Sequence, residues 1–482
     1  MLFAREINRV LVGALLALTV IGTSALYWAV VGPDTILRRD DNPRLFLAEA
    51  ALQRGRIYDR HNILLADTLV SEAGTVRRFY PEPAVNGVLG YASLRYGTSG
   101  VEDAFNVILR GDDLPADFTN ILTAQLLHRA QRGSDIRLTL DLQVQSALAQ
   151  AMGEQHGAAV VLSVPDGDVL ALISLPTFDP NRLDADWDRL RDHQDDPFFN
   201  RVLQGRYQPG GTLQTPLMAA AILYNMALDQ PLEGATAPVE LNGLTLGCAV
   251  RLPPLNLSLR EAYGFACPRP FADLGEALGT AALQATLDTF RLNRPPHNLF
   301  AGMTGQTDVV PPYPVGEDAL IENALGQSEL LVNPLNMAMM AAAIANDGNS
   351  PQPYLLMSRR APDESDWSAI SIGRPTIPFM TSATARQLQD LMRNAVVNGA
   401  AFNAGRPGID IGGHAALAYA GDRVLSWFVG FATLGGRQGL AVAVVLENTD
   451  DPGLAADIGG AALAAAQNAA QVAAAETSTA LP

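Results

Sequence analysis

The stretch from residue 158 to 174 reads AAVVLSVPDGDVLALIS and holds two apolar runs on either side of a turn. The runs are Ala158–Ser163 and Val169–Ser174, and the turn between them is Pro165-Asp166-Gly167-Asp168. Apolar runs of this length around a Pro/Asp/Gly turn are typical of a β-hairpin. Two similar runs return near the end of the chain, at Val424–Thr433 and Leu440–Glu447. The pattern predicts a sheet built from both ends of this region.

A long section rich in Ala, Leu and Met separates the two sets of strands. Apolar residues recur there at helical spacing, which predicts helices over 216–227, 271–290 and 334–346. Before the hairpin, Ile136–Leu140 reads as a strand and 141–153 as a helix, and an Ala-rich helix over 454–475 follows the last strand. Strands that flank a helical middle section predict an α+β fold.

Composition excludes several classes of function. The chain has 482 residues, 48% of them hydrophobic, and a net charge of −17, and its 33 basic residues are all arginine. The length allows about two to four domains, and the acidic balance argues against nucleic acid as the main partner. A chain without lysine cannot use Schiff-base chemistry, a Walker A phosphate loop or a Ser–Lys dyad. We expect no cofactor. We also expect no metal site, because the six histidines are not spaced along the chain as metal ligands usually are.

The N-terminus predicts a membrane anchor. Val10–Val31 has no charged residue over 22 positions, with Arg5 and Arg9 before it and Asp34 after it. That length can span a bilayer, and it exceeds the apolar core of a cleavable signal peptide, which is the alternative interpretation. Residues 1–9 are then a short cytoplasmic tail, and the chain crosses the plasma membrane once at 10–31.

Short motifs follow the anchor in a fixed order. They read RGRIYDR at 54–60, YP at 80–81, YGTSGVE at 96–102, LRG at 109–111, LTLD at 138–141 and PTFDPN at 176–181. In this order and spacing the series resembles the class B penicillin-binding proteins, although Asn62 stands where the family has Gly. The resemblance implies a small, strand-rich pedestal or dimerisation-like domain over 34–135. It further implies an extracytoplasmic transpeptidase domain of the serine β-lactamase-like fold over 136–475, before a disordered tail over 476–482.

The first motif that carries the family's chemistry is degenerate here. The family performs acyl transfer with a serine at the start of a helix and a lysine three residues later, so both side chains share one helix face. The matching segment, residues 207–214, reads YQPGGTLQ, which places Gly211 at the serine and Gln214 at the lysine. Glycine has no side chain to attack with, and an amide is not a base near neutral pH.

The second and third motifs have lost their functional residues as well. Ala266 and Pro268 stand at the two polar positions of the family's Ser-x-Asn motif. In the third motif, Lys-Thr-Gly, the lysine position is taken by Gly413 or His414, depending on a register that is uncertain by one residue. No intact catalytic residue therefore remains, and the weak substitute is the hydroxyl of Thr212, next to the missing serine.

The two cysteines, Cys248 and Cys267, lie 19 residues apart, and Cys267 is at the centre of the second motif. They could form a disulfide in an extracytoplasmic domain, or they could remain buried free thiols.

The sequence thus predicts a membrane-anchored, catalytically inactive homologue that acts in peptidoglycan synthesis or cell division. It would work as a scaffold or bind muropeptides. The partners implied by the resemblance are the peptidoglycan stem peptide or membrane proteins of the division or elongation machinery. The alternative is an active transpeptidase-type acyltransferase with a non-standard nucleophile such as Thr212.

Overall fold

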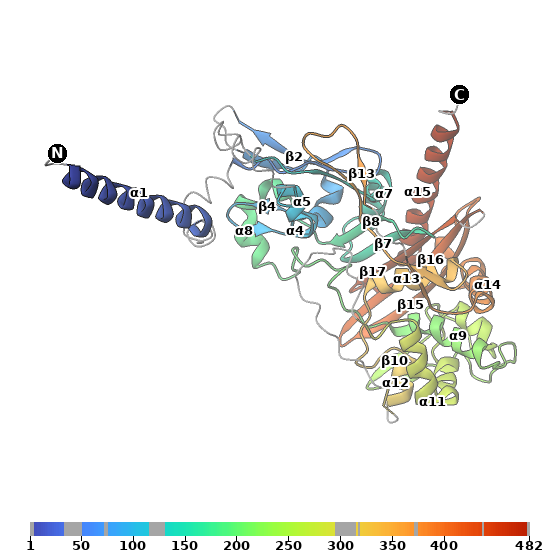
Figure 1. The fold of residues 1–482 in the computed structure, drawn as a ribbon. Coiled ribbons are helices and arrows are strands. Elements are labelled where there is room, and N and C mark those ends of the chain that lie inside the picture. The colour runs from blue at the N-terminus through green and yellow to red at the C-terminus, as the bar shows by residue number, and fades with distance from the viewer. Residues whose placement is uncertain are drawn as a thin grey trace.

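A five-stranded antiparallel sheet forms the centre of the fold, with the strand order β15-β16-β17-β7-β8. The computed structural model describes residues 4–32, 51–71, 76–114, 131–294, 315–316, 319–370, 375–435 and 438–479. The strands of this sheet are β7 (Gly157–Val164), β8 (Val169–Leu175), β15 (Asp410–Ala420), β16 (Arg423–Gly435) and β17 (Gln438–Glu447). The predicted hairpin is β7 and β8, and the late strands pair beside it, so the expected α+β class is confirmed (Figure 1).

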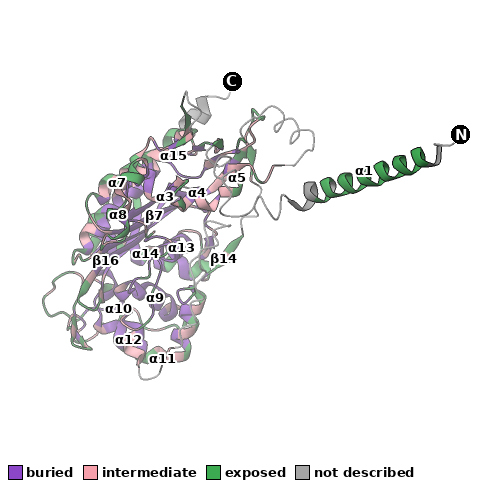
Figure 2. Cartoon of the chain, turned by 90° about the vertical axis from the view of Figure 1, so that its left-hand side faces the viewer, coloured by how far each residue is buried: buried purple, intermediate pink, exposed green. Residues whose placement is uncertain are grey.

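Helices cover both faces of this sheet. Along β17 the side chains alternate: Ala443 and Val445 belong to the core on the face covered by α13 (Pro334–Ala345), whereas Val442 and Val444 face the opposite core. On that opposite face lie α7 (Leu142–Met152) and α15 (Pro452–Thr479). A strand covered on both faces needs apolar residues at every position, which is why the runs in the sequence do not alternate. Figure 2 shows β7 and β16 as buried.

A helical lobe packs beyond the β15 edge of the sheet. It contains the helices α9 (Gln214–Leu223), α10 (Leu259–Gly264), α11 (Arg269–Thr289), α12 (Leu320–Ala324) and α14 (Ser382–Asn398). Helix α11 consists of two halves, because Gly279 has a φ of 75° and interrupts the helical geometry. A small hairpin of β9 (Val239–Leu241) and β10 (Leu244–Leu246) lies in the connection between α9 and α10.

The N-terminal domain is built on a second sheet. Its order is β13-β12-β6-β1-β2-β3, and its strands are β1 (Ile57–Tyr58), β2 (Leu64–Val70), β3 (Val76–Phe79), β6 (Asp135–Leu138), β12 (Leu356–Arg360) and β13 (Ser368–Ala369). The domain limit predicted between residues 135 and 136 falls inside β6. The first three strands therefore share one sheet with strands from much later in the chain.

Short elements complete the described chain. Around the N-terminal sheet lie α3 (Asn86–Leu89), α4 (Gly100–Ala104) and α5 (Asn106–Arg110), and α8 (Leu183–Arg191) follows β8. Two further strand pairs are β4 (Ala92–Ser93) with β5 (Gly97–Thr98) and β11 (Asn349–Pro351) with β14 (Thr376–Pro378).

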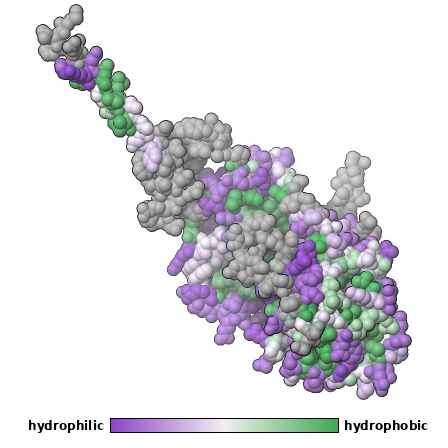
Figure 3. Space-filling model, turned by 60° about the horizontal axis from the view of Figure 1, so that its bottom comes forward, coloured by the Kyte–Doolittle hydropathy of each residue, from purple (hydrophilic) through white to green (hydrophobic). Residues whose placement is uncertain are grey.

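The N-terminal helix α1 spans Ala4–Gly32. Its stretch Glu6–Ala25 is long and apolar enough to cross a membrane, and none of it is buried against the protein. Figure 3 shows a band of hydrophobic surface over the middle of this helix. An exposed apolar helix of this length is compatible with a membrane span.

The last helix, α15, corrects one expectation. It runs to Thr479, although a disordered tail was expected from residue 476, and residues 480–482 lie outside the described residues. The physical reason is composition: from Ala461 to Leu481 neither glycine nor proline interrupts an alanine-rich run. Alanine has the highest helix propensity.

Candidate functional site

The first motif lies at the start of the helical lobe, as its register in the sequence predicts. A 3₁₀ turn over Gly210–Leu213 leads directly into α9. Gly210 has a φ of 51° and its N–H donates to the carbonyl of Gly326 at 3.0 Å. A Cβ on Gly326 would lie 2.5 Å from the Gly210 oxygen, so both positions need glycine for this close approach. The turn is therefore fixed against the segment that follows α12.

Gly211 and Gln214 are the residues that the sequence register predicts at the positions of nucleophile and base. A Cβ on Gly211 would lie 2.9 Å from the Cβ of Ala416 on β15, which leaves little space for a side chain there. Gln214 is buried, and its Nε2 donates to the carbonyl of Cys267 at 3.4 Å. Its Oε1 has no hydrogen-bond partner in the described part of the chain. Neither residue can start an acyl transfer.

The second motif lies across from Gln214, in the turn between α10 and α11. Ala266 has a φ of 50°, a left-handed conformation that is uncommon for residues other than glycine. Ala266 and Pro268 are both buried and both line the same small cavity as Gln214. The backbone of the motif is thus held in a strained form, but the hydroxyl and the amide of the family are absent.

The third motif lies on β15, the edge strand of the sheet. The ring of His414 stacks on Tyr263 of α10 at 4.3 Å between ring centroids, and its Nε2 lies 3.1 Å from the carbonyl oxygen of Gly211. Gly413 faces the opposite side, where a Cβ would lie 2.3 Å from the ring of Phe428. Of the two candidate positions, only His414 points toward the first motif.

The His414 side chain cannot replace a permanently charged lysine. It is 1% exposed, and burial lowers its pKa to about 4, although the hydrogen bond to Gly211 opposes that shift. Its Nδ1 has no partner among the described residues. A neutral imidazole at neutral pH supplies no cation for a carboxylate.

The buried His414 predicts a pH-dependent stability. The unfolded chain protonates this imidazole near pH 6.5 and the folded chain only near pH 4, so the free energy of unfolding falls as the pH is lowered through this window. The loss is expected to reach about 3 kcal/mol at pH 4. Denaturant unfolding from pH 7 to pH 4 should show this slope in the native chain and in His193→Gln, and a much smaller slope in His414→Phe. An equal slope in His414→Phe would contradict the assignment.

The cavity between the three motifs measures only about 30 Å³. At liquid density that volume corresponds to about one water molecule. Gln327 and Tyr419 help to close it: the Gln327 amide donates to the backbone oxygen of Tyr419 at 2.9 Å and accepts from its backbone nitrogen at 3.3 Å. The backbone of the edge strand is thus occupied by a side chain of the same protein. Neither residue is identifiable as part of the site from the sequence, where the one local signal is that Gln327 follows Gly326.

Thr212, the substitute nucleophile considered above, does not reach this cavity. It is 1% exposed, and its hydroxyl donates to the carbonyl oxygen of Pro209 at 2.6 Å. It does not belong to the described lining of the cavity. This geometry argues against Thr212 as a nucleophile.

The structure places a disulfide between Cys248 and Cys267. Through it, the loop after β10 is tied to the second motif, and Gly247 and Ala249 of this loop line the cavity. Within the described residues, no group of three or more His, Cys, Asp or Glu side chains is arranged to hold a metal ion.

Comparison with known proteins gives two family matches. Residues 54–136 match the penicillin binding protein A dimerisation domain, and residues 157–471 match the penicillin binding protein transpeptidase domain. These matches cover both sheets of the fold.

Relatives of nearly full length are similar as well. The peptidoglycan D,D-transpeptidase PbpA of Mycolicibacterium smegmatis is 31% identical over 96% of this chain and 98% of its own length, and PbpA of Mycobacterium tuberculosis is 32% identical over 89% and 92%. Among solved structures, penicillin-binding protein A from M. tuberculosis as an imipenem acyl-enzyme complex aligns with a TM-score of 0.77 and 31% identity, over 87% of this chain and 99% of that one.

Proposed function

Because this chain belongs to the class B penicillin-binding proteins, as its family matches and full-length relatives show, we propose that it is an inactive member of the family that takes part in peptidoglycan synthesis as a scaffold. The proposal is supported by the sequence of the first motif, in which Gly211 and Gln214 stand where the family's register would place the nucleophile and the base. Loss of nucleophile and base removes covalent catalysis whatever the rest of the cleft provides.

The small size of the cavity between the three motifs favours the role of a scaffold over the role of a muropeptide-binding protein. A peptide ligand needs a concave site of several hundred Å³, whereas the cavity between the three motifs measures about 30 Å³. The Gln327 amide also occupies the backbone groups of Tyr419 on the edge strand, which a bound peptide would need for β-augmentation. The partners of such a scaffold are membrane proteins of the division or elongation machinery.

The proposed location is the outer face of the plasma membrane. Helix α1 supports a single membrane pass by its length and composition. We place residues 1–9 in the cytoplasm and the two folded domains outside. An extracytoplasmic location is also one in which the Cys248–Cys267 disulfide persists.

The proposal predicts that the cellular role does not depend on the Thr212 hydroxyl. In cells that lack the gene, we expect the native chain and Thr212→Ala to restore wall growth and cell shape equally, at equal protein level, because neither performs acyl transfer. Thr212→Ser, which keeps a hydroxyl, is the matched control. Rescue by Thr212→Ser and by the native chain but not by Thr212→Ala would favour the acyltransferase instead.

A further inference from the structure

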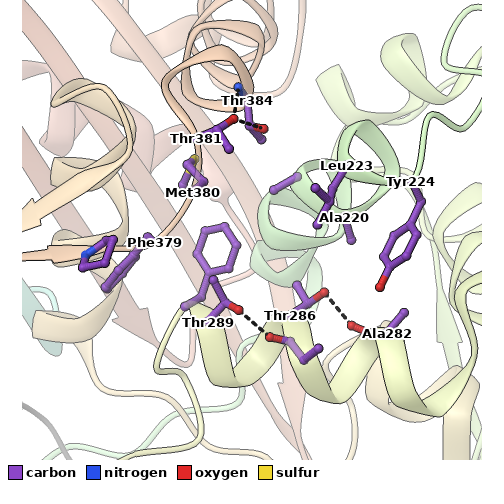
Figure 4. A pocket seen from close by; sticks show the side chains of 14 residues that line it. Ala220, Leu223, Tyr224, Ala282, Thr286, Thr289, Phe379, Met380, Thr381 and Thr384 are labelled. Carbon is purple, nitrogen blue, oxygen red and sulfur yellow. Dashed lines mark hydrogen bonds between the residues drawn. The ribbon is translucent and has the colours of Figure 1, made fainter.

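The helical lobe contains a hollow of about 350 Å³ that is separate from the lost catalytic cleft. Ala220 of α9 and Tyr224, which directly follows this helix, line one side of it. Thr286 and Thr289 of α11 line another side, and the Phe379–Thr384 segment lines the third (Figure 4). It lies at the C-terminal end of α9, whereas the catalytic positions lie at the start of the same helix. We propose that this hollow is a binding site for a small, neutral, largely aliphatic molecule.

The hollow exists because two helices face each other with small side chains. Helix α9 contributes Ala219 and Ala220, and the second half of α11 contributes Ala282 and Ala285. Large residues at these positions would fill the gap between the helices. At the inner end, the rings of Phe290 and Phe379 pack edge to face at 5.8 Å between centroids, and both are buried.

The lining selects a neutral ligand. Its described lining contains no charged residue, although the whole chain carries a net charge of −17. The hydroxyls of Thr286 and Thr289 donate to the carbonyls of Ala282 and Ala285 at 2.7 Å, and the hydroxyls of Thr381 and Thr384 lie 2.9 Å apart. These hydroxyls already have hydrogen-bond partners within the protein. A charged ligand would therefore lose its hydration without gaining an ion pair or a counter-charge in the hollow.

The mouth of the hollow provides one polar contact. Tyr224 is 54% exposed, and its hydroxyl forms no hydrogen bond with another described residue. Figure 4 shows this hydroxyl at the edge of the space that Thr286 borders. Leu223 beside it is 64% exposed, so the apolar lining reaches the surface at the mouth of the hollow.

Size and chemistry together define the ligand class. The volume of 350 Å³ falls in the range of small-molecule sites and corresponds to about a dozen water molecules at liquid density. It therefore accommodates a molecule of about a dozen non-hydrogen atoms. A medium-chain alcohol fits this description: its chain fills the hollow and its hydroxyl meets Tyr224.

The test uses the full chain in nanodiscs and a photoactivatable probe. The probe is a ten-carbon alcohol with a diazirine at the chain end, and the labelled residues are mapped by peptide mass spectrometry. We expect saturable labelling within 219–224 and 282–290 that excess 1-decanol removes. The positions of the labelled residues distinguish binding in the hollow from labelling of α1, which is expected when the probe simply dissolves in the lipid.

Matched variants keep the test decisive. Ala285 is exposed, so Ala285→Trp adds an indole to the hollow without disturbing the core. We expect it to reduce labelling of the site at least about tenfold. Ala277→Trp, at an exposed position of α11 outside the hollow, should not reduce it. Tyr224→Phe should weaken competition by 1-decanol and leave competition by decane unchanged. Labelling that does not saturate, that Ala285→Trp leaves intact, or that is confined to α1 would overturn the proposal.

Discussion

Replacing Glu102 by glutamine is expected to lower the free energy of unfolding by about 3–5 kcal/mol. Glu102 is completely buried in the N-terminal domain and joins two arginines. Its Oε2 accepts from Arg54 Nε at 3.0 Å, and its Oε1 accepts from Arg78 Nε at 2.6 Å. Glutamine keeps the shape of the side chain but leaves two guanidinium groups in the interior without a counter-charge.

The charge state of Glu102 supports this expectation. Burial alone would raise the pKa of the carboxyl, but attraction to Arg78 and Arg54 outweighs burial and lowers it. A lowered pKa means that the carboxylate stabilises the fold above its unfolded pKa and loses that effect as the pH falls.

Denaturant unfolding at pH 7, followed by tryptophan fluorescence, measures the effect. Glu82→Gln makes the same change at a half-exposed residue of the same domain and should stay within about 0.5 kcal/mol of the native chain. A loss for Glu102→Gln as small as that for Glu82→Gln would show that the arginines do not depend on this carboxylate.

Much of the fold could be predicted from the sequence because its signals are local. Two apolar runs and a Pro-Asp-Gly turn predict the hairpin at 158–174, and in the structure these runs pair as β7 and β8. Flanking residues fix the register of Gly211 and Gln214 in the first motif; in the structure Gly211 lies in the 3₁₀ turn before α9, and Gln214 is the first residue of α9.

Other features could not be predicted because they depend on contacts between distant segments. Gln327 and Tyr419 are far apart in sequence, and their pairing requires β15 to lie beside the segment that follows α12. The choice between Gly413 and His414 was open because a register slip of one residue moves a side chain to the other face of a strand. In the structure, His414 lies against Gly211 and Gly413 against Phe428.

The loss of acylation is the largest effect that the account predicts. In other enzymes, removal of nucleophile and base slows the reaction by about 10⁶-fold. Here the sequence register predicts Gly211 and Gln214 at these two positions. His414, the third-motif candidate that points toward them, is neutral at pH 7. The M. tuberculosis penicillin-binding protein A, solved as acyl-enzyme complexes, is the natural reference for a side-by-side comparison.

The most direct test is covalent labelling with a fluorescent penicillin. Both proteins are incubated with the reagent and then separated on a denaturing gel, with samples boiled beforehand as the control for non-specific label. We predict a labelled band for the M. tuberculosis protein and none for this chain or its Thr212→Ala variant, even after prolonged incubation. A band for this chain that survives denaturation and disappears when the sample is boiled first would contradict the account.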